Sequence, residues 1–139
     1  MKIMIINGPN LNLIGKREPE IYGTRSFDEF LSELKNQFSS ISIEYFQSNI
    51  EGEIIQKIHD TGFCYDGIIL NAGGYTHTSV AISDAVKAVS TPVIEVHISN
   101  IYARENYRRT SLLAPFVKGI ISGFGLNSYR IALQAFIPK

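Results

Sequence analysis

Residues 2–23 read KIMIINGPNLNLIGKREPEIYG, an apolar run followed by a long polar segment rich in asparagine and glycine. The apolar run has the length and the branched residues of a buried strand. The polar segment, Asn7–Gly23, is far longer than the usual connection of about two to six residues between a strand and a helix, so it is either functional or disordered. Its leucine, isoleucine and tyrosine residues argue against disorder. We therefore predict a loop that contributes to a functional site, with a mobile second half at about residues 15–25.

The rest of the chain alternates short apolar runs with segments of helical periodicity. Ser26 and Glu29 have the spacing of an N-terminal capping box, and apolar residues recur behind them at the spacing of one helix face. Gly62 ends the next helical segment, where we expect the left-handed backbone that glycine adopts at little cost. The predicted strands are residues 2–7, 42–47, 66–71, 92–98 and 117–122, and the predicted helices are residues 26–38, 50–62, 79–89 and 127–136, with a short helix after Arg109.

Strands that alternate with helices indicate a parallel sheet with right-handed crossover connections. Five such units predict a flavodoxin-like, three-layer α/β sandwich of strand order 2-1-3-4-5, formed by a single domain of residues 1–139. In this order, ligands bind beyond the carboxyl ends of the first and third strands. Polar residues lie at the ends of the first, third and fourth predicted strands or just beyond them, as this placement requires. They are Asn7, Asn10, Asn71, His77, Glu95, His97, Ser99 and Asn100.

The composition is that of a globular protein in water: of 139 residues, 45% are hydrophobic and 19% are charged. The 13 basic and 13 acidic residues balance and form no basic block, which argues against a nucleic-acid or anionic-membrane partner. The lone cysteine, Cys64, forms no internal disulfide, and no apolar run has the length of a membrane span. The N-terminus has the pattern of a strand rather than a signal peptide, so we expect a cytoplasmic protein. The zero net charge also gives little protection against self-association.

The three histidines differ in their surroundings. Glu95 and His97 are two residues apart on a predicted strand, so their side chains point to the same face. A histidine oriented by a carboxylate can act as an acid or a base, but the same spacing also fits a partly buried ion pair without a catalytic role. His77 lies in the glycine-rich segment 72–77, where small residues let a ligand approach the backbone. His59 lies near the end of an amphipathic helix and is predicted to be a surface residue.

Two groups of residues suggest a charged ligand or intermediate. Arg17 and Tyr22 lie together in the long loop. A tyrosine serves as a base only when its pKa falls from about 10 toward neutrality, which nearby cations can cause. The alternative is that the tyrosine ring packs and the arginine is solvated. Arg104, Arg108 and Arg109 follow the fourth strand and indicate an anionic or polyhydroxylated ligand, although solvation at the surface also explains such a group.

Several familiar sites are absent from the sequence. The segment Gly123–Gly125 begins like a dinucleotide-binding fingerprint, but Ser128 stands at the third glycine position and the segment follows the last strand. No P-loop, HExxH motif or cysteine-rich zinc spacing is present. Proton-transfer chemistry is therefore the class that the sequence leaves most open.

Four long motifs occur in order along the chain. They are NGPNLNLIGKREPEIYG at residues 7–23, LNAGGYTHTSVAISDA at 70–85, VIEVHISNIYARENYR at 93–108 and ISGFGLNSYRIAL at 121–133. Over essentially its whole length, the chain resembles the type II 3-dehydroquinate dehydratases, also called type II dehydroquinases. Four such motifs in the right order are far more specific than any single short pattern.

The resemblance implies conversion of 3-dehydroquinate to 3-dehydroshikimate with loss of water, a step of the shikimate pathway. In this family Tyr22 would be the base that removes the proton next to the ketone and gives an enolate. Arg17, on a flexible lid, would lower the pKa of that tyrosine and stabilise the negative charge. His97, oriented by Glu95, would protonate the departing hydroxyl, and Asn10 would help to bind a water that stabilises the enolate oxygen.

The same resemblance implies which residues bind the substrate. Asn71 and the backbone of Ile98 and Ser99 would bind its carboxylate. His77 and Arg108 would bind the hydroxyl groups of its ring.

The family also implies an assembly. Asp84 would complete the site from a neighbouring subunit, because the family forms dodecamers built from trimers. No cofactor, metal or Schiff-base lysine is implied. The sequence departs from the family pattern at Tyr102, a position that is often histidine, and it matches only loosely after Arg108. These departures concern the rim of the site and the subunit contacts more than the chemistry.

Three other classes of protein share the expected fold. A flavin-binding flavodoxin needs a Ser/Thr-rich phosphate loop after the first strand, and the sequence NGPN is not such a loop. A receiver domain needs an acidic cluster at the end of the first strand, where Asn7 stands. A catalytically inactive ring-binding module would lack Tyr22 or His97, and both are present.

Overall fold

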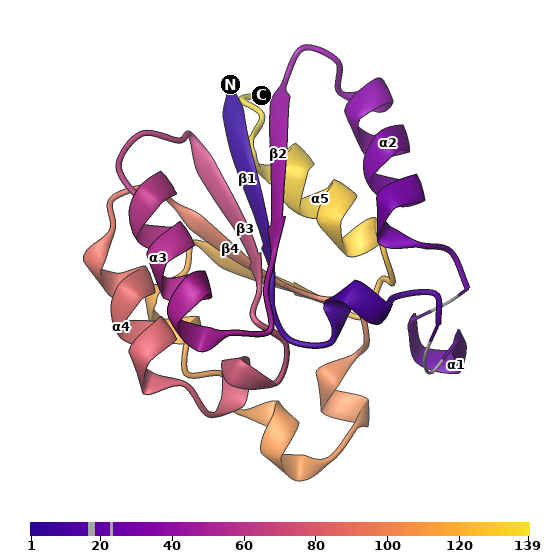
Figure 1. The fold of residues 1–139 in the computed structure, drawn as a ribbon, viewed down its shortest axis with the longest axis vertical. Helices are drawn as coiled ribbons and strands as arrows, with labels where there is room; N and C mark the ends of the chain where they lie inside the picture. The colour runs from indigo at the N-terminus through magenta and orange to yellow at the C-terminus, as the bar shows by residue number, and fades with distance from the viewer. Residues whose placement is uncertain (17–18, 23) are drawn as a thin grey trace.

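The computed structural model of the protein describes residues 1–16, 19–22 and 24–139, with residues 21 and 22 described by their backbone alone. Within these ranges, five parallel strands form a sheet of order β2-β1-β3-β4-β5 (Figure 1). This confirms the predicted flavodoxin-like order. The strands are β1 (Lys2–Asn7), β2 (Ser42–Gln47), β3 (Gly67–Asn71), β4 (Val93–His97) and β5 (Gly119–Ser122), and the α-helices are α1 (Pro19–Tyr22), α2 (Phe27–Gln37), α3 (Glu51–Thr61), α4 (Val80–Ala88) and α5 (Asn127–Phe136).

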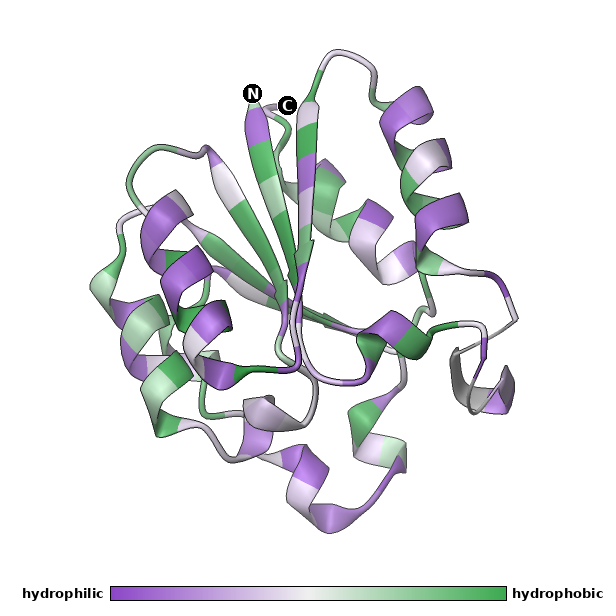
Figure 2. Cartoon of the chain, in the orientation of Figure 1, coloured by the Kyte–Doolittle hydropathy of each residue, from purple (hydrophilic) through white to green (hydrophobic). Residues whose placement is uncertain are grey.

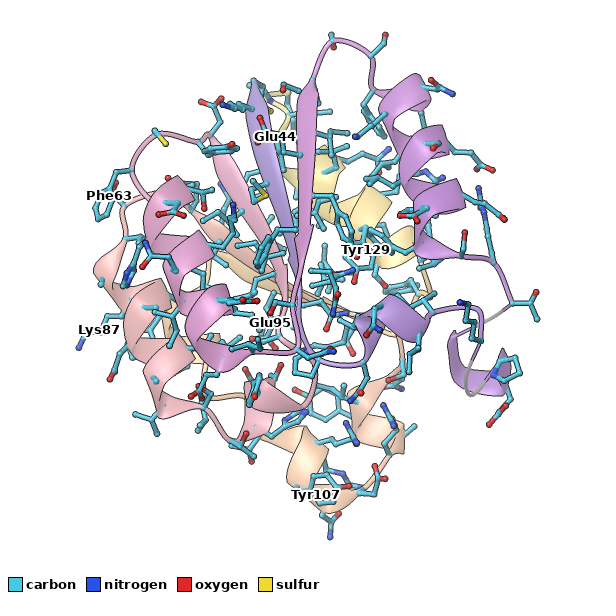
Figure 3. The ribbon with its side chains drawn as sticks, viewed as in Figure 1. Glu44, Phe63, Lys87, Glu95, Tyr107 and Tyr129 are labelled. Atoms are coloured by element: carbon cyan, nitrogen blue, oxygen red, sulfur yellow. The ribbon has the colours of Figure 1, made fainter. Side chains whose placement is uncertain are left out.

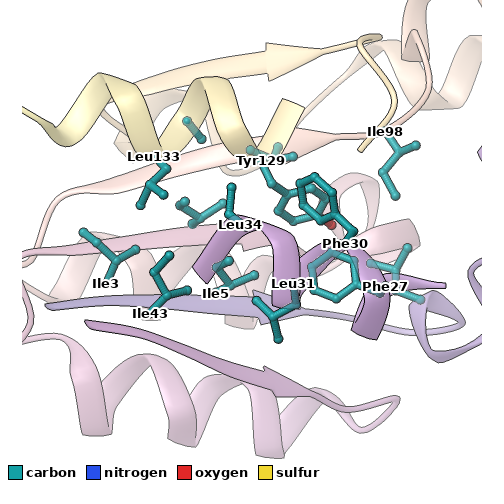
Figure 4. Packing of buried hydrophobic residues seen from close by; sticks show 14 of the residues in the cluster. Ile3, Ile5, Phe27, Phe30, Leu31, Leu34, Ile43, Ile98, Tyr129 and Leu133 are labelled. Atoms are coloured by element: carbon teal, nitrogen blue, oxygen red, sulfur yellow. The ribbon is translucent and has the colours of Figure 1, made fainter. Parts of the chain in front are cut away.

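Helices cover both faces of the sheet, so successive residues of a strand enter different hydrophobic clusters. Ile3 and Ile5 of β1 pack in the cluster that α2 and α5 contribute to, which Figure 4 shows from close by. Met4 and Ile6 pack in the opposite cluster with α3 and α4. Figure 2 shows the result, with hydrophobic residues along the strands and hydrophilic residues on the outer sides of the helices. Such two-sided burial explains why the strands are almost continuously apolar in the sequence.

Helix α2 begins where the sequence predicts. The Ser26 hydroxyl accepts a hydrogen bond from the Glu29 backbone N–H at 3.2 Å, which caps the helix. The predicted apolar face is buried, and Phe27 packs edge-on against Tyr129 of α5 with ring centroids 5.0 Å apart. The aromatic pair joins the two helices that cover this face of the sheet.

The connections at the carboxyl edge of the sheet are built largely from short 3₁₀ turns rather than open loops. The short helix predicted after Arg109 is a single 3₁₀ turn, η5 (Ala114–Phe116), which leads into the start of β5. Within the described residues no helix has the length and hydropathy that crossing a lipid bilayer requires. The turns at this edge are η1 (Leu11–Leu13), η2 (Gly73–His77), η3 (Ile101–Ala103) and η4 (Asn106–Arg109).

Gly62 ends α3 as predicted, but not for the predicted reason. Its φ is −72°, which is right-handed, so the expectation of a left-handed cap is wrong. A Cβ at this position would overlap the Val89 side chain and lie 2.7 Å from the Ile58 carbonyl oxygen. Glycine is therefore required here by the close approach of the segment after α4, not by backbone conformation.

Gly62→Ala is expected to lower the free energy of unfolding by about 1–3 kcal/mol, because the added methyl group must displace Val89 or the end of α3. Gly52→Ala is the matched control in the same helix, since a Cβ there meets no atom within 4 Å. The control should be as stable as the wild type or more stable by up to about 1 kcal/mol. Urea unfolding measures both, and equal stability of the two variants would contradict the steric explanation.

Candidate active site

The carboxyl ends of three strands meet at the edge of the sheet where the 3₁₀ turns gather (Figure 1). Asn7 and Asn71 are register partners at the ends of β1 and β3. The Gly8 backbone N–H donates to the Asn71 carbonyl oxygen at 2.7 Å, so the two following loops begin in contact. A Cβ at Gly8 would lie 2.6 Å from the Ala72 carbonyl oxygen, which leaves room only for glycine. The edge therefore has the geometry of a ligand crevice at the point where the winding of the sheet reverses.

A cavity of about 140 Å³ opens at this crevice. It brings together most of the residues predicted to form the site. Apolar walls of Leu11, Ile14 and Ile101 surround the polar groups. The predicted residues that line it are Asn10, Asn71, His77, His97, Ile98, Ser99 and Arg108.

Glu95, which Figure 3 labels, is completely buried, and His97 is 5% exposed. One carboxylate oxygen, Oε2, lies 2.6 Å from His97 Nε2. Because a carboxylate only accepts hydrogen bonds, Nε2 carries the hydrogen and donates it. The other ring nitrogen, Nδ1, has no hydrogen-bond partner among the residues that the structure describes. The predicted contact between these two residues is confirmed, and it leaves one ring nitrogen free for chemistry at the cavity.

His77 has the opposite arrangement of its ring nitrogens. Its Nδ1 lies 2.7 Å from the Thr110 carbonyl oxygen, so Nδ1 donates and Nε2 is left as the second polar atom. The ring stacks on His97 with centroids 6.3 Å apart and planes inclined by 20°. Partial burial lowers the pKa of His77, with smaller contributions from His97 and Arg108, while the Thr110 carbonyl acts in the other direction. The lowered pKa favours the neutral form of His77 more strongly than that of a histidine in water.

A buried hydrogen-bond network on the face of the sheet that α5 covers fixes the side chain of Asn71. Its Nδ2 donates to the Tyr129 hydroxyl at 2.9 Å, and that hydroxyl donates to Asn7 Oδ1 at 2.7 Å. The Gly73 backbone N–H donates to Asn71 Oδ1 at 3.2 Å. With these partners the orientation of the Asn71 amide at the cavity wall is determined rather than free to flip.

The loops after β1 and β4 are also tied down. Asn10 adopts a left-handed backbone with a φ of 69°, which asparagine tolerates better than most residues, and its N–H donates to Asn49 Oδ1 at 2.9 Å. Arg104 Nη1 donates to Ser99 Oγ at 3.2 Å. The Gly125 N–H donates to the Ile98 carbonyl oxygen at 2.9 Å. These bonds give the cavity walls a defined shape.

Only two of the three arginines within residues 104–109 reach the cavity. Arg104 and Arg108 line the cavity, whereas Arg109 is exposed and does not. Arg108 Nε donates to Glu105 Oε2 at 2.7 Å, and Glu105 is exposed to solvent. Partial burial acts to lower the pKa of Arg108, but the bond to Glu105 outweighs it and the pKa is raised. The guanidinium groups of Arg104 and Arg108 thus share the Glu105 carboxylate as a partner, at 3.9 and 2.7 Å, while both side chains line the cavity.

Some residues that were predicted for the site do not line the cavity of this chain or lie outside the described part of the structure. Asp84 lies on α4, is exposed, and does not line the cavity of its own chain. Tyr22 ends α1, but its side chain lies outside the description, and Arg17 lies outside the described residues altogether. His59 is exposed on α3, which confirms its prediction as a surface residue.

Three contributors to the site were not singled out from the sequence. Arg104 was noted only as part of a basic group. Tyr129 occurs as one apolar position of a helical pattern, although a buried tyrosine hydroxyl normally requires a partner. Ser111 donates to Glu95 Oε1 at 2.7 Å and lies in the segment that matches the family motifs only loosely. No local pattern marks Ser111, because its partner belongs to another element.

The fold and the cavity together define a class of protein. It is a flavodoxin-like α/β protein with a site for acid–base chemistry on an anionic ligand, located beyond the carboxyl ends of its strands.

Comparisons with known proteins identify the family within this class. The family model described as dehydroquinase class II matches residues 1–137. The chain is 56% identical over 137 residues to a 3-dehydroquinate dehydratase of Caldicellulosiruptor bescii, covering 96% of this chain and 94% of that one. It is 54% identical over 142 residues to a protein of the same name from Clostridium perfringens, covering 100% and 99%. The crystal structure of a type II dehydroquinase from Butyrivibrio crossotus superposes with a TM-score of 0.94 at 45% identity, covering 98% of this chain and 97% of that one. The chain belongs to the class II dehydroquinase family.

Loss of stability below pH 6.5 is expected to depend in part on His77. The pKa of His77 is lowered from 6.5 in the folded state. At a pH between the folded and the unfolded pKa, the unfolded chain therefore binds more protons than the folded chain. The corresponding stabilisation is complete above pH 6.5 and is lost as the pH falls through the folded value. His77→Asn, whose amide can still donate to the Thr110 carbonyl, should weaken this pH dependence in urea unfolding. His59→Asn is the control and should keep the wild-type dependence. Identical pH profiles for the wild type and His77→Asn would contradict the prediction.

Proposed function

We propose that the chain catalyses the elimination of water from 3-dehydroquinate to give 3-dehydroshikimate, a step of the shikimate pathway toward chorismate and the aromatic amino acids. The observation that carries the proposal is the buried Glu95–His97 pair, which opens onto a cavity lined by Arg104 and Arg108. The substrate is an anionic, polyhydroxylated ring, and the relatives named above are 3-dehydroquinate dehydratases. The reaction needs a base, a group that stabilises an enolate, and an acid.

Substrate binding is assigned to the cavity walls. Asn71, with its amide fixed by Tyr129, and the backbone N–H groups of Ile98 and Ser99 bind the carboxylate. His77 of η2 and Arg108 of η4, which also line the cavity, bind the ring hydroxyls. The free Nε2 of His77 suits this role, because a neutral ring nitrogen accepts a hydrogen bond from a hydroxyl.

The first chemical step is proton removal. The Tyr22 phenolate takes the proton next to the ketone, and the electron pair moves onto the carbonyl oxygen as an enolate. Arg17 stabilises both the phenolate and the enolate from the loop of residues 15–25, which acts as a lid that excludes water. Asn10 helps to bind the water molecule that donates to the enolate oxygen. This step therefore draws on the long connection after β1, where the sequence analysis placed a functional loop.

The second step is loss of the hydroxyl group. The enolate electrons form the carbon–carbon double bond, the carbon–oxygen bond breaks, and the departing oxygen takes a proton from His97, so that water leaves. Glu95 accepts the Nε2–H of His97 and stabilises the protonated ring, which leaves the Nδ1 side for proton donation. At the end Tyr22 holds the proton taken from the substrate and His97 lacks the proton given to the leaving water, so one proton must return from Tyr22 to His97 through solvent before the next turnover. The proposed reaction thus requires no cofactor and no metal ion.

The site is proposed to be completed by assembly. Asp84 reaches the site of a neighbouring subunit, in a dodecamer built from trimers. The position of Asp84 supports this, since the residue is exposed on α4 and does not line the cavity of its own chain.

Mixing the protein with 3-dehydroquinate in the presence of a chelator is expected to produce the enone absorbance of 3-dehydroshikimate. Tyr22→Phe and His97→Ala should each lower kcat by about 10²- to 10⁴-fold, the range that general acid–base groups contribute. His59→Ala, a change at an exposed histidine of α3, is the control and should keep the wild-type rate. A folded wild-type protein without activity would refute the proposed function. A His97→Ala rate close to the wild-type rate would refute the role of His97 as the acid.

Shared sites predict complementation between inactive variants. Asp84→Asn and His97→Ala are each expected to be nearly inactive, because every site lacks one group. When the two are unfolded together and refolded as mixed oligomers, about a quarter of the sites should combine an intact His97 with an intact neighbouring Asp84. His97→Ala mixed with Tyr22→Phe should recover nothing, since both residues act in the same chain. Equal recovery in the two mixtures, or none in the first, would refute the contribution of Asp84 across an interface.

A further inference from the structure

A short segment after η4 contacts His77 directly and reaches His97 through Glu95. The Thr110 carbonyl oxygen accepts from His77 Nδ1 at 2.7 Å, and Ser111 Oγ donates to Glu95 Oε1 at 2.7 Å. Leu112 anchors the segment, because its N–H donates to the Thr76 carbonyl at 2.9 Å and its carbonyl accepts from Ser83 Oγ at 2.7 Å. Three consecutive residues therefore connect the two rings to η2 and α4.

The hydrogen bonds of Ser111 determine the direction of its hydroxyl. Ser111 Oγ accepts from the backbone N–H groups of Leu113 at 3.2 Å and Ala114 at 3.1 Å. A serine hydroxyl has two acceptor positions and one hydrogen. With both acceptor positions occupied, the hydrogen is directed at Glu95 Oε1, and Ser111 cannot instead accept from a protonated Glu95.

The buried carboxylate consequently has one donor for each oxygen. Glu95 Oε1 receives the Ser111 hydroxyl, and Oε2 receives the His97 Nε2–H. An ionised carboxylate that is completely buried is strongly destabilised unless its oxygens are hydrogen-bonded. Loss of either donor would leave one oxygen unsatisfied and would allow the carboxylate to turn away from its remaining partner.

We propose that Ser111 is a positioning residue for the acid step. By fixing the Glu95 carboxylate, it keeps the Nε2–H of His97 bonded to Glu95, so that the second proton, which the departing hydroxyl takes, is carried on Nδ1. The expected effect of Ser111 on catalysis rests on the proposed function, but its effect on the position of Glu95 and His97 does not. Ser111 does not line the cavity, so it acts through Glu95 and His97 rather than on the substrate.

The other ionisable groups around His97 are not substitutes for Ser111. His77 stacks on the ring from η2, and Arg104 and Arg108 line the cavity from the segments around η3 and η4. None of these three residues has a hydrogen bond to Glu95 among the contacts of the described residues. Within that part of the chain, Ser111 is the group that satisfies Glu95 Oε1.

The test compares Ser111→Ala with Ser83→Ala. Both variants remove a serine hydroxyl that ties down residues 111–112, but only Ser111 touches Glu95. Steady-state kinetics with 3-dehydroquinate and ¹⁵N NMR of the histidine side chains are measured on the full-length, assembled proteins. Thermal unfolding confirms that each variant is folded. The NMR signals report which nitrogen of His97 carries the hydrogen, whether or not the protein is active.

Ser111→Ala is expected to lower kcat by about 10- to 100-fold, the range for a lost hydrogen bond to a charged group, with KM within about twofold of the wild type. The population of His97 with its hydrogen on Nε2 should fall in this variant. Ser83→Ala should keep the wild-type kcat within about threefold and the wild-type NMR signals.

Two results would overturn the inference. One is an Ser111→Ala protein whose His97 signals equal those of the wild type, and the other is a Ser83→Ala protein with the same loss of kcat as Ser111→Ala. A wild-type protein that does not convert 3-dehydroquinate would refute the proposed function instead, and the NMR comparison would still decide whether Ser111 positions His97.

Discussion

Helices cover both faces of the sheet, and this constraint leaves buried polar side chains chiefly the ends of the strands. Asn7, Asn71 and His97 occupy those ends. Glu95 is the exception, since it lies two residues inside β4 and is completely buried. A charge in that position is tolerated only when its oxygens are hydrogen-bonded, so the neighbouring structure must supply donors. The position of His97 and the course of the chain at Ser111 both satisfy this requirement.

The sheet separates the two polar networks of the site. Glu95 and His97 project to the side that α3 and α4 cover, because they alternate with Ile94 and Val96 of the other cluster. Asn7 and Asn71 project to the side of α5, where Tyr129 joins them. The groups for proton transfer and the amide for anion binding are thus fixed by different halves of the core. A change in the packing of one half need not disturb the geometry of the other.

The sequence predicts those features of the fold and the site that depend on a local pattern of residues. Five apolar runs and their spacing specify the sheet order, and the position of Glu95 two residues before His97 predicts their contact. What it does not show are contacts between distant residues. The bond from Tyr129 to Asn7 spans 122 residues, and the bond from Ser111 to Glu95 spans 16. Gly62 failed as a prediction for the same reason, because the clash that excludes a side chain comes from Val89 on another segment.

The segment of residues 110–112 makes most of its contacts through the backbone. The Thr110 carbonyl, the Leu112 N–H and the Leu112 carbonyl form bonds that any residue can form, and Ser111 alone uses its side chain. Substitutions at positions 110 and 112 would therefore keep these backbone bonds, whereas an insertion or deletion would displace the partners of His77 and Glu95 at once. The number of residues in this segment thus matters more for these backbone bonds than the identity of residues 110 and 112.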